Sequence, residues 1–302
     1  FYQNSGIQKL LHSFHLYKVI SKNLEEIDKL APKVSKHFSE DFIPEILKPE
    51  GEVKHKVAFL TGCLMDVMFA DINRDTVDVL KACNCEIFTP KTQVCCGSLH
   101  AHNGDMETAK KLARQNIAAF EKNNYEYLVS NSAGCGAFMK EYSYLLEDDD
   151  LFAERAKVFS AKVKDVTEFI ADIKSELKFN PLKSSVTYHD ACHLAHTQKI
   201  TSQPRELLNA IPGLDIRDLD ESSWCCGSAG IYNITRFTDS MFMLKRKMNH
   251  IKNTDANIVV TGNPGCISQI KYGAEKFNLK IEVIHPVTLF KRSLIDKNDK
   301  SE

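Results

Sequence analysis

The 302-residue sequence has no apolar run of about 18 residues, so it predicts no membrane-spanning helix. Its formal net charge is −1, which gives no reason to expect nucleic acid or an anionic membrane surface as a partner. It also lacks paired carboxylates, a Ser-His-Asp arrangement and the Gly-x-Gly-x-x-Gly fingerprint of nucleotide binding. These absences disfavour a chain that oxidises a substrate on its own bound flavin or nicotinamide.

The composition is that of an ordinary globular protein, with 43% apolar and 26% charged residues. The length allows two domains, each with its own core. Ten cysteines without a signal peptide indicate a cytoplasmic protein with metal or redox chemistry, not a disulfide framework. The chain begins at Phe1 without an initiator Met, so we expect a fragment of something longer.

Eight of the ten cysteines form two copies of one pattern, in which an isolated cysteine precedes a Cys-Cys-Gly tripeptide and another follows it. The copies are Cys63, Cys95, Cys96 and Cys135, and Cys192, Cys225, Cys226 and Cys266. The offset between the copies is 129 to 131 residues, which indicates an internal duplication. A duplicated fold needs matching apolar positions for its core, but it does not need matching thiols. Two matched sets of thiols therefore predict two matched metal centres.

Each half of the sequence alternates short apolar runs with stretches of helical periodicity, which is typical of parallel sheets in an α/β fold. The expected strands are 57–60, 86–88 and 127–130 in one half, and 186–188, 214–216 and 258–261 in the other. Every cysteine of the repeated pattern follows one of these strands. Because ligands gather at the carboxyl ends of parallel strands, the four thiols of each half should converge.

The predicted organisation is a helical lead-in over residues 1–53, a first repeat over 54–180 and a second repeat over 181–302. The lead-in is expected to connect or dock, without chemistry of its own, and its apolar positions Leu10, Leu11, Phe14, Leu16 and Ile20 indicate helix. The connection between the repeats contains an acidic run and an amphipathic helix that begins near Val163 and extends to Ile173.

Four thiols from strand-end loops suit a zinc ion, an iron–sulfur cluster or a thiol–disulfide site. Zinc sites usually pair ligands as Cys-x2-Cys, but Phe138 and Gln269 stand three residues after Cys135 and Cys266. Adjacent cysteines fit poorly around one small ion but can reach different irons of a cluster. The spacing therefore favours clusters, with zinc in one repeat and a thiol–disulfide site as alternatives.

The other candidates receive plainer interpretations. Cys83 is expected at a helix end and Cys85 as a small buried hydrophobe, while Trp224 is expected to shield the second site from water. Five histidines near the cysteines are expected to support the sites without binding metal: His100, His102, His189, His193 and His196.

Several short motifs around the cysteines resemble those of a known family. The repeated pattern is similar to the cysteine-rich CCG domains of heterodisulfide reductase, over roughly residues 55 to 290. The flanking motifs are closer to the iron–sulfur subunit of glycolate oxidase: Thr61-Gly62-Cys63, Ser132-Ala133-Gly134-Cys135-Gly136-Ala137-Phe138, Cys225-Cys226-Gly227-Ser228-Ala229-Gly230 and Lys247-Met248-Asn249.

The resemblance implies an α/β fold of two tandem CCG domains related by pseudo-twofold symmetry, with [4Fe-4S] clusters on the eight cysteines. It further implies an electron-transfer subunit that takes electrons from a flavin subunit, which holds the FAD and oxidises glycolate or another 2-hydroxy acid. The electrons would continue to a quinone or other acceptor, with the complex peripheral at the inner face of the membrane.

The resemblance leaves two other functions open: a heterodisulfide reductase-like thiol–disulfide reductase subunit and a lactate-utilisation iron–sulfur subunit. The sequence departs from the family in two respects. The ferredoxin module of the full-length family protein is absent from these 302 residues, so we expect it upstream in the same full-length chain. The last cysteine of the heterodisulfide reductase motif is replaced by Phe138 and Gln269, which puts that enzyme's cluster type and disulfide cleavage in doubt.

Overall fold

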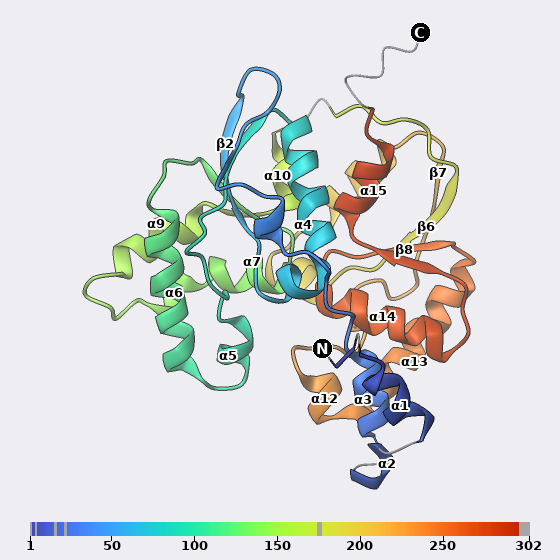
Figure 1. The fold of residues 1–302 in the computed structure, drawn as a ribbon. Helices are drawn as coiled ribbons and strands as arrows, with labels where there is room; N and C mark the ends of the chain where they lie inside the picture. The colour runs from blue at the N-terminus through green and yellow to red at the C-terminus, as the bar shows by residue number, and fades with distance from the viewer. Residues whose placement is uncertain (1, 4, 15–16, 21–22, 174–176, 296–302) are drawn as a thin grey trace.

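The computed structural model describes residues 2–3, 5–14, 17–20, 23–173 and 177–295. Two α/β units stand side by side, with the amino-terminal helices packed beneath the second unit (Figure 1). None of the helices in these ranges is long and apolar enough to cross a membrane.

The first repeat is built on a five-stranded sheet with the order β1-β3-β2-β4-β5, in which only β1 is antiparallel to its neighbour. Its strands are β1 (Ile46–Leu47), β2 (His55–Leu60), β3 (Cys85–Phe88), β4 (Tyr127–Ser130) and β5 (Val163–Asp165). Its helices are α4 (Leu64–Ala82), α5 (Ser98–His102), α6 (Met106–Phe120), α7 (Ala133–Lys140), α8 (Tyr142–Leu145), α9 (Ala153–Ala161) and α10 (Val166–Asp172).

The second repeat has a four-stranded parallel sheet with the order β7-β6-β8-β9. Its strands are β6 (Ser184–Tyr188), β7 (Leu214–Arg217), β8 (Ile258–Val260) and β9 (Glu282–Ile284). Its helices are the π-helix η2 (His193–Thr197), α11 (Ser202–Asn209), α12 (Tyr232–Thr235), α13 (Phe237–Thr254), α14 (Pro264–Lys276) and α15 (Pro286–Ser293). Without β1, the first sheet has the same strand order as the second. The predicted α/β duplication is therefore confirmed.

One expected element is different. The predicted connecting helix begins too early, because Val163 lies in β5 and the helix α10 starts at Val166. Val163 pairs with Leu128 of β4 and is buried, so the segment extends the sheet before it turns into the helix. The second repeat ends in the same way, with β9 followed by α15.

The lead-in contains α1 (Ile7–Ser13), α2 (Tyr17–Ile20), α3 (Leu24–Leu30) and the 3₁₀ turn η1 (Ser39–Asp41). It contacts both repeats. β1 pairs with β3 of the first sheet, and α3 packs on α14, where Glu26 accepts a hydrogen bond from Tyr272 and pairs with Lys276. Leu16, one of the apolar positions that indicate helix in this segment, lies outside the described residues.

A shared hydrophobic core joins the repeats. Helices α4 and α10 of the first repeat pack against α11 and α15 of the second, with Val77, Phe169, Leu208 and Phe290 among the buried side chains. Helices α4, α10 and α15 occupy the space between the two sheets (Figure 1). The duplicated units are thus packed as one body, and this packing positions the carboxyl ends of both sheets toward each other.

Candidate metal centres

In the first repeat, three strands deliver the four thiols. Cys63 precedes α4 at the end of the β2 loop, and the loop after β3 carries Cys95 and Cys96. Cys135 lies in the first turn of α7, directly after β4. All four lie at the carboxyl edge of the parallel strands, where adjacent loops meet.

The second repeat repeats this arrangement. Cys192 precedes η2 after strand β6, and Cys225 and Cys226 lie in the loop after β7. Cys266 lies in the first turn of α14, after β8. The second set is more enclosed: Cys266 is buried where Cys135 is partly exposed, and Cys192 is partly buried where Cys63 is exposed.

The thiols within each set interact in the same order. The Sγ atoms of Cys63 and Cys95 are 3.4 Å apart, and hydrogen bonds from Cys63 and Cys96 hold the pKa of Cys95 far below its usual range. In the second set, hydrogen bonds from Cys192 and Cys226 likewise lower the pKa of Cys225. The pKa of the last cysteine of each set, Cys135 or Cys266, is also lowered, first by a hydrogen bond from Cys96 or Cys226. Each set therefore has two thiols that ionise readily, and a thiolate is the form that binds metal.

A glycine after each cysteine pair lets the backbone reach the sulfur. Gly97 and Gly227 adopt φ of +87° and +95°, a region that disfavours side chains. Their amides point back to the preceding sulfurs, at 3.4 Å from Cys95 and 3.3 Å from Cys225. This backbone N–H to sulfur contact stabilises a thiolate and is the same in both repeats.

All eight cysteines line one cavity, which has a volume of about 120 Å³. Hydrogen bonds across the repeat boundary frame it. The amide of Ala133 donates to Gly262 O at 3.1 Å, and Gln198 donates to Ala133 O at 3.0 Å. The two thiol sets therefore face a common space instead of lying on opposite sides of the molecule.

Asn263 is a site residue that the cysteine pattern does not reveal. Its side chain accepts from the Gly134 amide at 3.3 Å, and its amide group lies 3.7 Å from the sulfur of Cys266. It holds the N-cap position of α14 without a capping hydrogen bond from its side chain, and the helix continues with Pro264. The available signal is an Asn-Pro pair at a helix start, because Asn favours the capping position and Pro the first turn.

The histidines take different roles. The rings of His102 and His193, one from each repeat, lie 5.4 Å apart at the cavity wall. His193 Nδ1 is 3.7 Å from Cys192 Sγ. His100 pairs with Asp105 at the surface. The remaining two differ in exposure: His189 is buried, whereas His196 is exposed beside Ser223 O.

The expectation for Trp224 is wrong. Its side chain is 45% exposed and stacks with Arg246 at 4.5 Å, and it does not line the cysteine cavity. Its position in sequence beside Cys225 does not turn the ring inward. The plain expectations for the other cysteines agree with the structure, since Cys83 caps the end of α4 and Cys85 is buried in β3.

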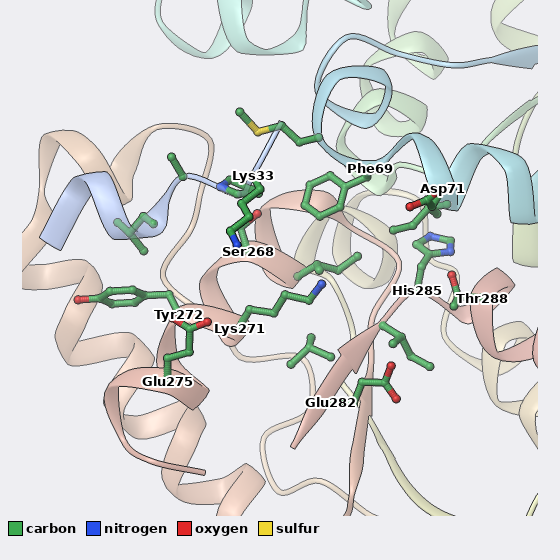
Figure 2. Close-up of a pocket in the computed structure, with 18 of the residues that line it drawn as sticks. Lys33, Phe69, Asp71, Ser268, Lys271, Tyr272, Glu275, Glu282, His285 and Thr288 are labelled. Atoms are coloured by element: carbon green, nitrogen blue, oxygen red, sulfur yellow. The ribbon is translucent and has the colours of Figure 1, made fainter. Parts of the chain in front are cut away.

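A larger cavity, of about 670 Å³, lies between the lead-in, α4 and the α14–α15 region (Figure 2). Lys271 and Ser268 extend from α14 toward it, and Phe69 faces it from the kinked part of α4. Among the described residues that line it there is no cysteine. It is therefore separate from the thiol sets, although Ile267, next to Cys266, forms part of its wall.

The thiol sets fit an iron–sulfur group by their chemistry. Each offers four sulfur donors, the usual ligand number of a [2Fe–2S] or [4Fe–4S] cluster. Backbone and side-chain N–H groups point at the sulfurs, and such contacts tune clusters. A single tetrahedral ion with metal–sulfur bonds of about 2.3 Å also accepts four thiolates, so sulfur geometry does not separate the two. Metal binding by the eight cysteines remains a prediction.

Comparison with known proteins identifies the fold units. The model of the cysteine-rich domain family, CCG, matches residues 57–140 and 186–271. The chain belongs to the CCG cysteine-rich domain family. Both matches begin in the central strand of a repeat and end beyond its last cysteine, so the two CCG domains coincide with the two thiol sets.

Several relatives in this family have names that refer to iron–sulfur proteins or to lactate utilization. The chain is 39% identical to a probable glycolate oxidase iron-sulfur subunit of Bacillus subtilis, over 94% of this chain and 65% of that protein. It is 31% identical to lactate utilization protein A of Oceanobacillus iheyensis, over 76% of this chain and 94% of that protein. The chain thus spans just under two thirds of the first relative's length.

Among solved structures, the chain matches a putative Asp/Glu racemase from Yersinia pestis. The match covers 78% of this chain and 96% of that chain at 9% identity. Its TM-score of 0.28 is too low to support any argument.

Proposed function

We propose that this CCG protein is an iron–sulfur electron-transfer subunit of a complex that oxidises a 2-hydroxy acid. The observation that carries the proposal is the shared cavity, which two matched sets of four cysteines line. Two redox centres that face one space suit a relay. When bound, such clusters supply one-electron transfer, which is the step that must follow a two-electron oxidation on a flavin.

The ligands in this proposal are Cys63, Cys95, Cys96 and Cys135 for one [4Fe-4S] cluster, and Cys192, Cys225, Cys226 and Cys266 for the other. The chain's own groups hold the sulfurs and exclude water. Tyr142 is fully buried and donates to Cys96 O at 2.6 Å, which fixes the first Cys-Cys pair. Ser240 donates to Gly227 O at 2.8 Å and fixes the second pair.

Glycolate is the substrate we propose for the complex, because a relative that matches 94% of this chain is named for glycolate oxidase. Lactate is the second candidate, since relatives matched over nearly their whole length are named for lactate utilization. The proposed partners are an FAD-containing oxidase subunit, a ferredoxin module upstream in the same full-length chain and a quinone or other acceptor. The complex would lie in the cytoplasm or against the inner face of the membrane.

Anaerobic purification followed by metal analysis tests the proposal. We expect iron and acid-labile sulfide at both repeats, and zinc without sulfide would contradict it. A second test adds the FAD-containing oxidase subunit to the purified chain. Substrate should bleach the visible absorption of the chain only when that subunit is present, and turnover of glycolate or lactate by the isolated chain would contradict the relay.

A further inference from the structure

Two buried side chains distinguish the otherwise matched thiol sets. His189 stands three residues before Cys192, at the end of the central strand, and Leu60 holds the same place before Cys63. Both are 1% exposed. The duplication therefore places an imidazole beside the second set, where the first has only a hydrocarbon side chain.

His189 faces the sulfurs of its own repeat. A ring nitrogen and the Sγ atoms of Cys226 and Cys266 all lie within 4.8 Å of one another. Neither ring nitrogen has a hydrogen-bond partner among the described residues. The pKa of Cys266 is lowered first by a hydrogen bond from Cys226 and then by His189. The imidazole is thus buried beside two sulfurs with its N–H free to donate to one of them.

Lys247 is a second difference. It lies at the same distance in sequence after Cys225 as Ile117 does after Cys95, and both are fully buried. Its ammonium donates to Glu221 O at 2.5 Å and to Ser222 O at 3.3 Å, just before the second Cys-Cys pair. No carboxylate within the described ranges forms an ion pair with it. Burial lowers the pKa of Lys247, and attraction to Cys226, Glu221, Cys266 and Asp190 opposes that shift. The first set has a hydrocarbon side chain at this place.

Reduction adds negative charge to a thiolate-bound centre. An N–H donor on a ligand sulfur and a buried cation both stabilise that charge, which raises the reduction potential. The deeper burial of Cys266 acts the other way, because a low-dielectric environment disfavours charge. That same environment strengthens the attraction of Lys247, since Coulomb energies grow as the dielectric constant falls. Because a His189 ring nitrogen lies within 4.8 Å of two sulfurs and Lys247 binds the backbone just before the second Cys-Cys pair, we expect their effect to exceed that of burial.

We infer that the second repeat holds the centre of higher potential, with His189 as a positioning hydrogen-bond donor to Cys266 and Lys247 as its fixed cation. Electrons then pass from the first repeat to the second. One electron leaves the first site, which is oxidised, and enters the second, which is reduced, with no bond made or broken. The flavin of the partner supplies the electron and a quinone-class acceptor removes it. This inference rests on the proposed function.

Redox titration of the full chain, prepared anaerobically and followed by visible absorption and EPR, tests the assignment. Cys96→Ser and Cys226→Ser identify which midpoint belongs to which repeat. His189→Leu gives the second repeat the residue of the first, and Lys247→Met removes the charge while keeping the side-chain length. Both should lower the second midpoint and leave the first unchanged. His189→Gln keeps an N–H donor and should stay near wild type, as should His196→Leu, which alters an exposed imidazole in the same segment.

The inference is overturned if the midpoints are equal or reversed, or if His189→Leu and Lys247→Met leave the second midpoint in place. It is also overturned if His189→Gln shifts the midpoint as much as His189→Leu. Loss of the second centre in both His189 variants would make the imidazole a structural element or a ligand and would reject the tuning role. A wild-type chain without iron and sulfide would instead reject the proposed function, and this inference with it.

Discussion

The two repeats keep the same thiol geometry in different surroundings. In both, a Cys-Cys-Gly loop turns at a glycine of positive φ, and the glycine amide points at the first sulfur of the pair. Beyond this contact the repeats differ. Leu60 and Ile117 flank the first set, whereas His189 and Lys247 flank the second. The duplicated parts are those that place the donors, and the divergent parts are those that set the charge around them.

A second contrast concerns the segment after the first cysteine of each set. Cys63 opens the long helix α4, while Cys192 opens a short π-helix, η2. π-Helical turns are rare and concentrate at functional sites. This turn places His193 at the cavity wall, opposite His102 of the first repeat. The comparison therefore assigns most of the specialised structure to the second repeat.

The largest effect should come from removal of one ligand in either repeat. Cys96→Ser and Cys226→Ser each replace a buried sulfur of one set. We expect each variant to lose about half of the bound iron and sulfide while the other repeat keeps its centre, because the sets share no ligand. Metal analysis and EPR of the two variants measure this. Loss of both centres in either variant would show that the two sites are one cooperative unit.

The glycines of the two loops provide the next comparison. A Cβ at Gly227 would lie 2.6 Å from Ser240 O, whereas at Gly97 the nearest contact is Ala109 Cα at 3.3 Å. Positive φ alone costs an alanine roughly 1–2 kcal/mol. Gly97→Ala should therefore destabilise the protein by about 1–3 kcal/mol, and the backbone clash should bring Gly227→Ala to roughly 3–5 kcal/mol. Urea unfolding under anaerobic conditions measures both, and equal losses would contradict the packing difference.

The sequence predicts the strands and the cysteine loops well, because each apolar run is long enough to mark a strand and the thiols follow directly. It does not predict the short strands β1, β5 and β9. Val163–Asp165, for example, is a three-residue strand between two helices that is defined only by pairing with β4. The expectation for Trp224 fails for a similar reason. Adjacency to Cys225 in sequence says nothing about the direction of its side chain, which Arg246 holds at the surface.

The role of His189 is also hidden in the sequence. Three histidines lie near Cys192 in the sequence, and residue type alone does not show which of them contacts the sulfurs. Only the end of β6 decides between them, because it buries His189 beside the sulfurs and leaves His196 outside. The sequence thus identifies the donors of a site, but the tertiary packing identifies the groups that act on those donors.

The helices that end the two repeats, α10 and α15, have capping residues whose pKa values shift in opposite directions. Asp165 caps α10 and His285 caps α15, and both are buried. Burial raises the pKa of Asp165 to about 6 and lowers the pKa of His285 to about 3. Asp165 therefore contributes stability below about pH 4 that is lost as the pH rises to 6. His285 contributes stability above about pH 6.5 that is lost as the pH falls toward 3.

Asp165→Asn and His285→Asn separate these contributions, since Asn still caps a helix. In Asp165→Asn, stability should rise with pH between about 3 and 6.5 more steeply than in wild type. In His285→Asn, the stability relative to that of the wild type should fall as the pH rises from about 4 to 6. If the folded and unfolded pKa values of a group differ by two, its contribution to the free energy of unfolding changes by roughly 3 kcal/mol at most. Urea unfolding across this pH range measures the slopes, and parallel curves for the two variants would contradict the assignment.

The smallest effect is expected at Trp224. Its ring is 45% exposed and stacks with Arg246, and an exposed cation–π contact contributes about 0.5–1 kcal/mol. Trp224→Ala should therefore cost less than about 1 kcal/mol of unfolding free energy and leave the iron content and EPR signal of the second repeat unchanged. Trp224→Phe, which keeps an aromatic face for Arg246, is the matched control. If Trp224→Ala instead lost its second centre faster in air than Trp224→Phe did, the ring would protect that centre in solution, and the second repeat would depend on an outer aromatic layer that the first repeat lacks.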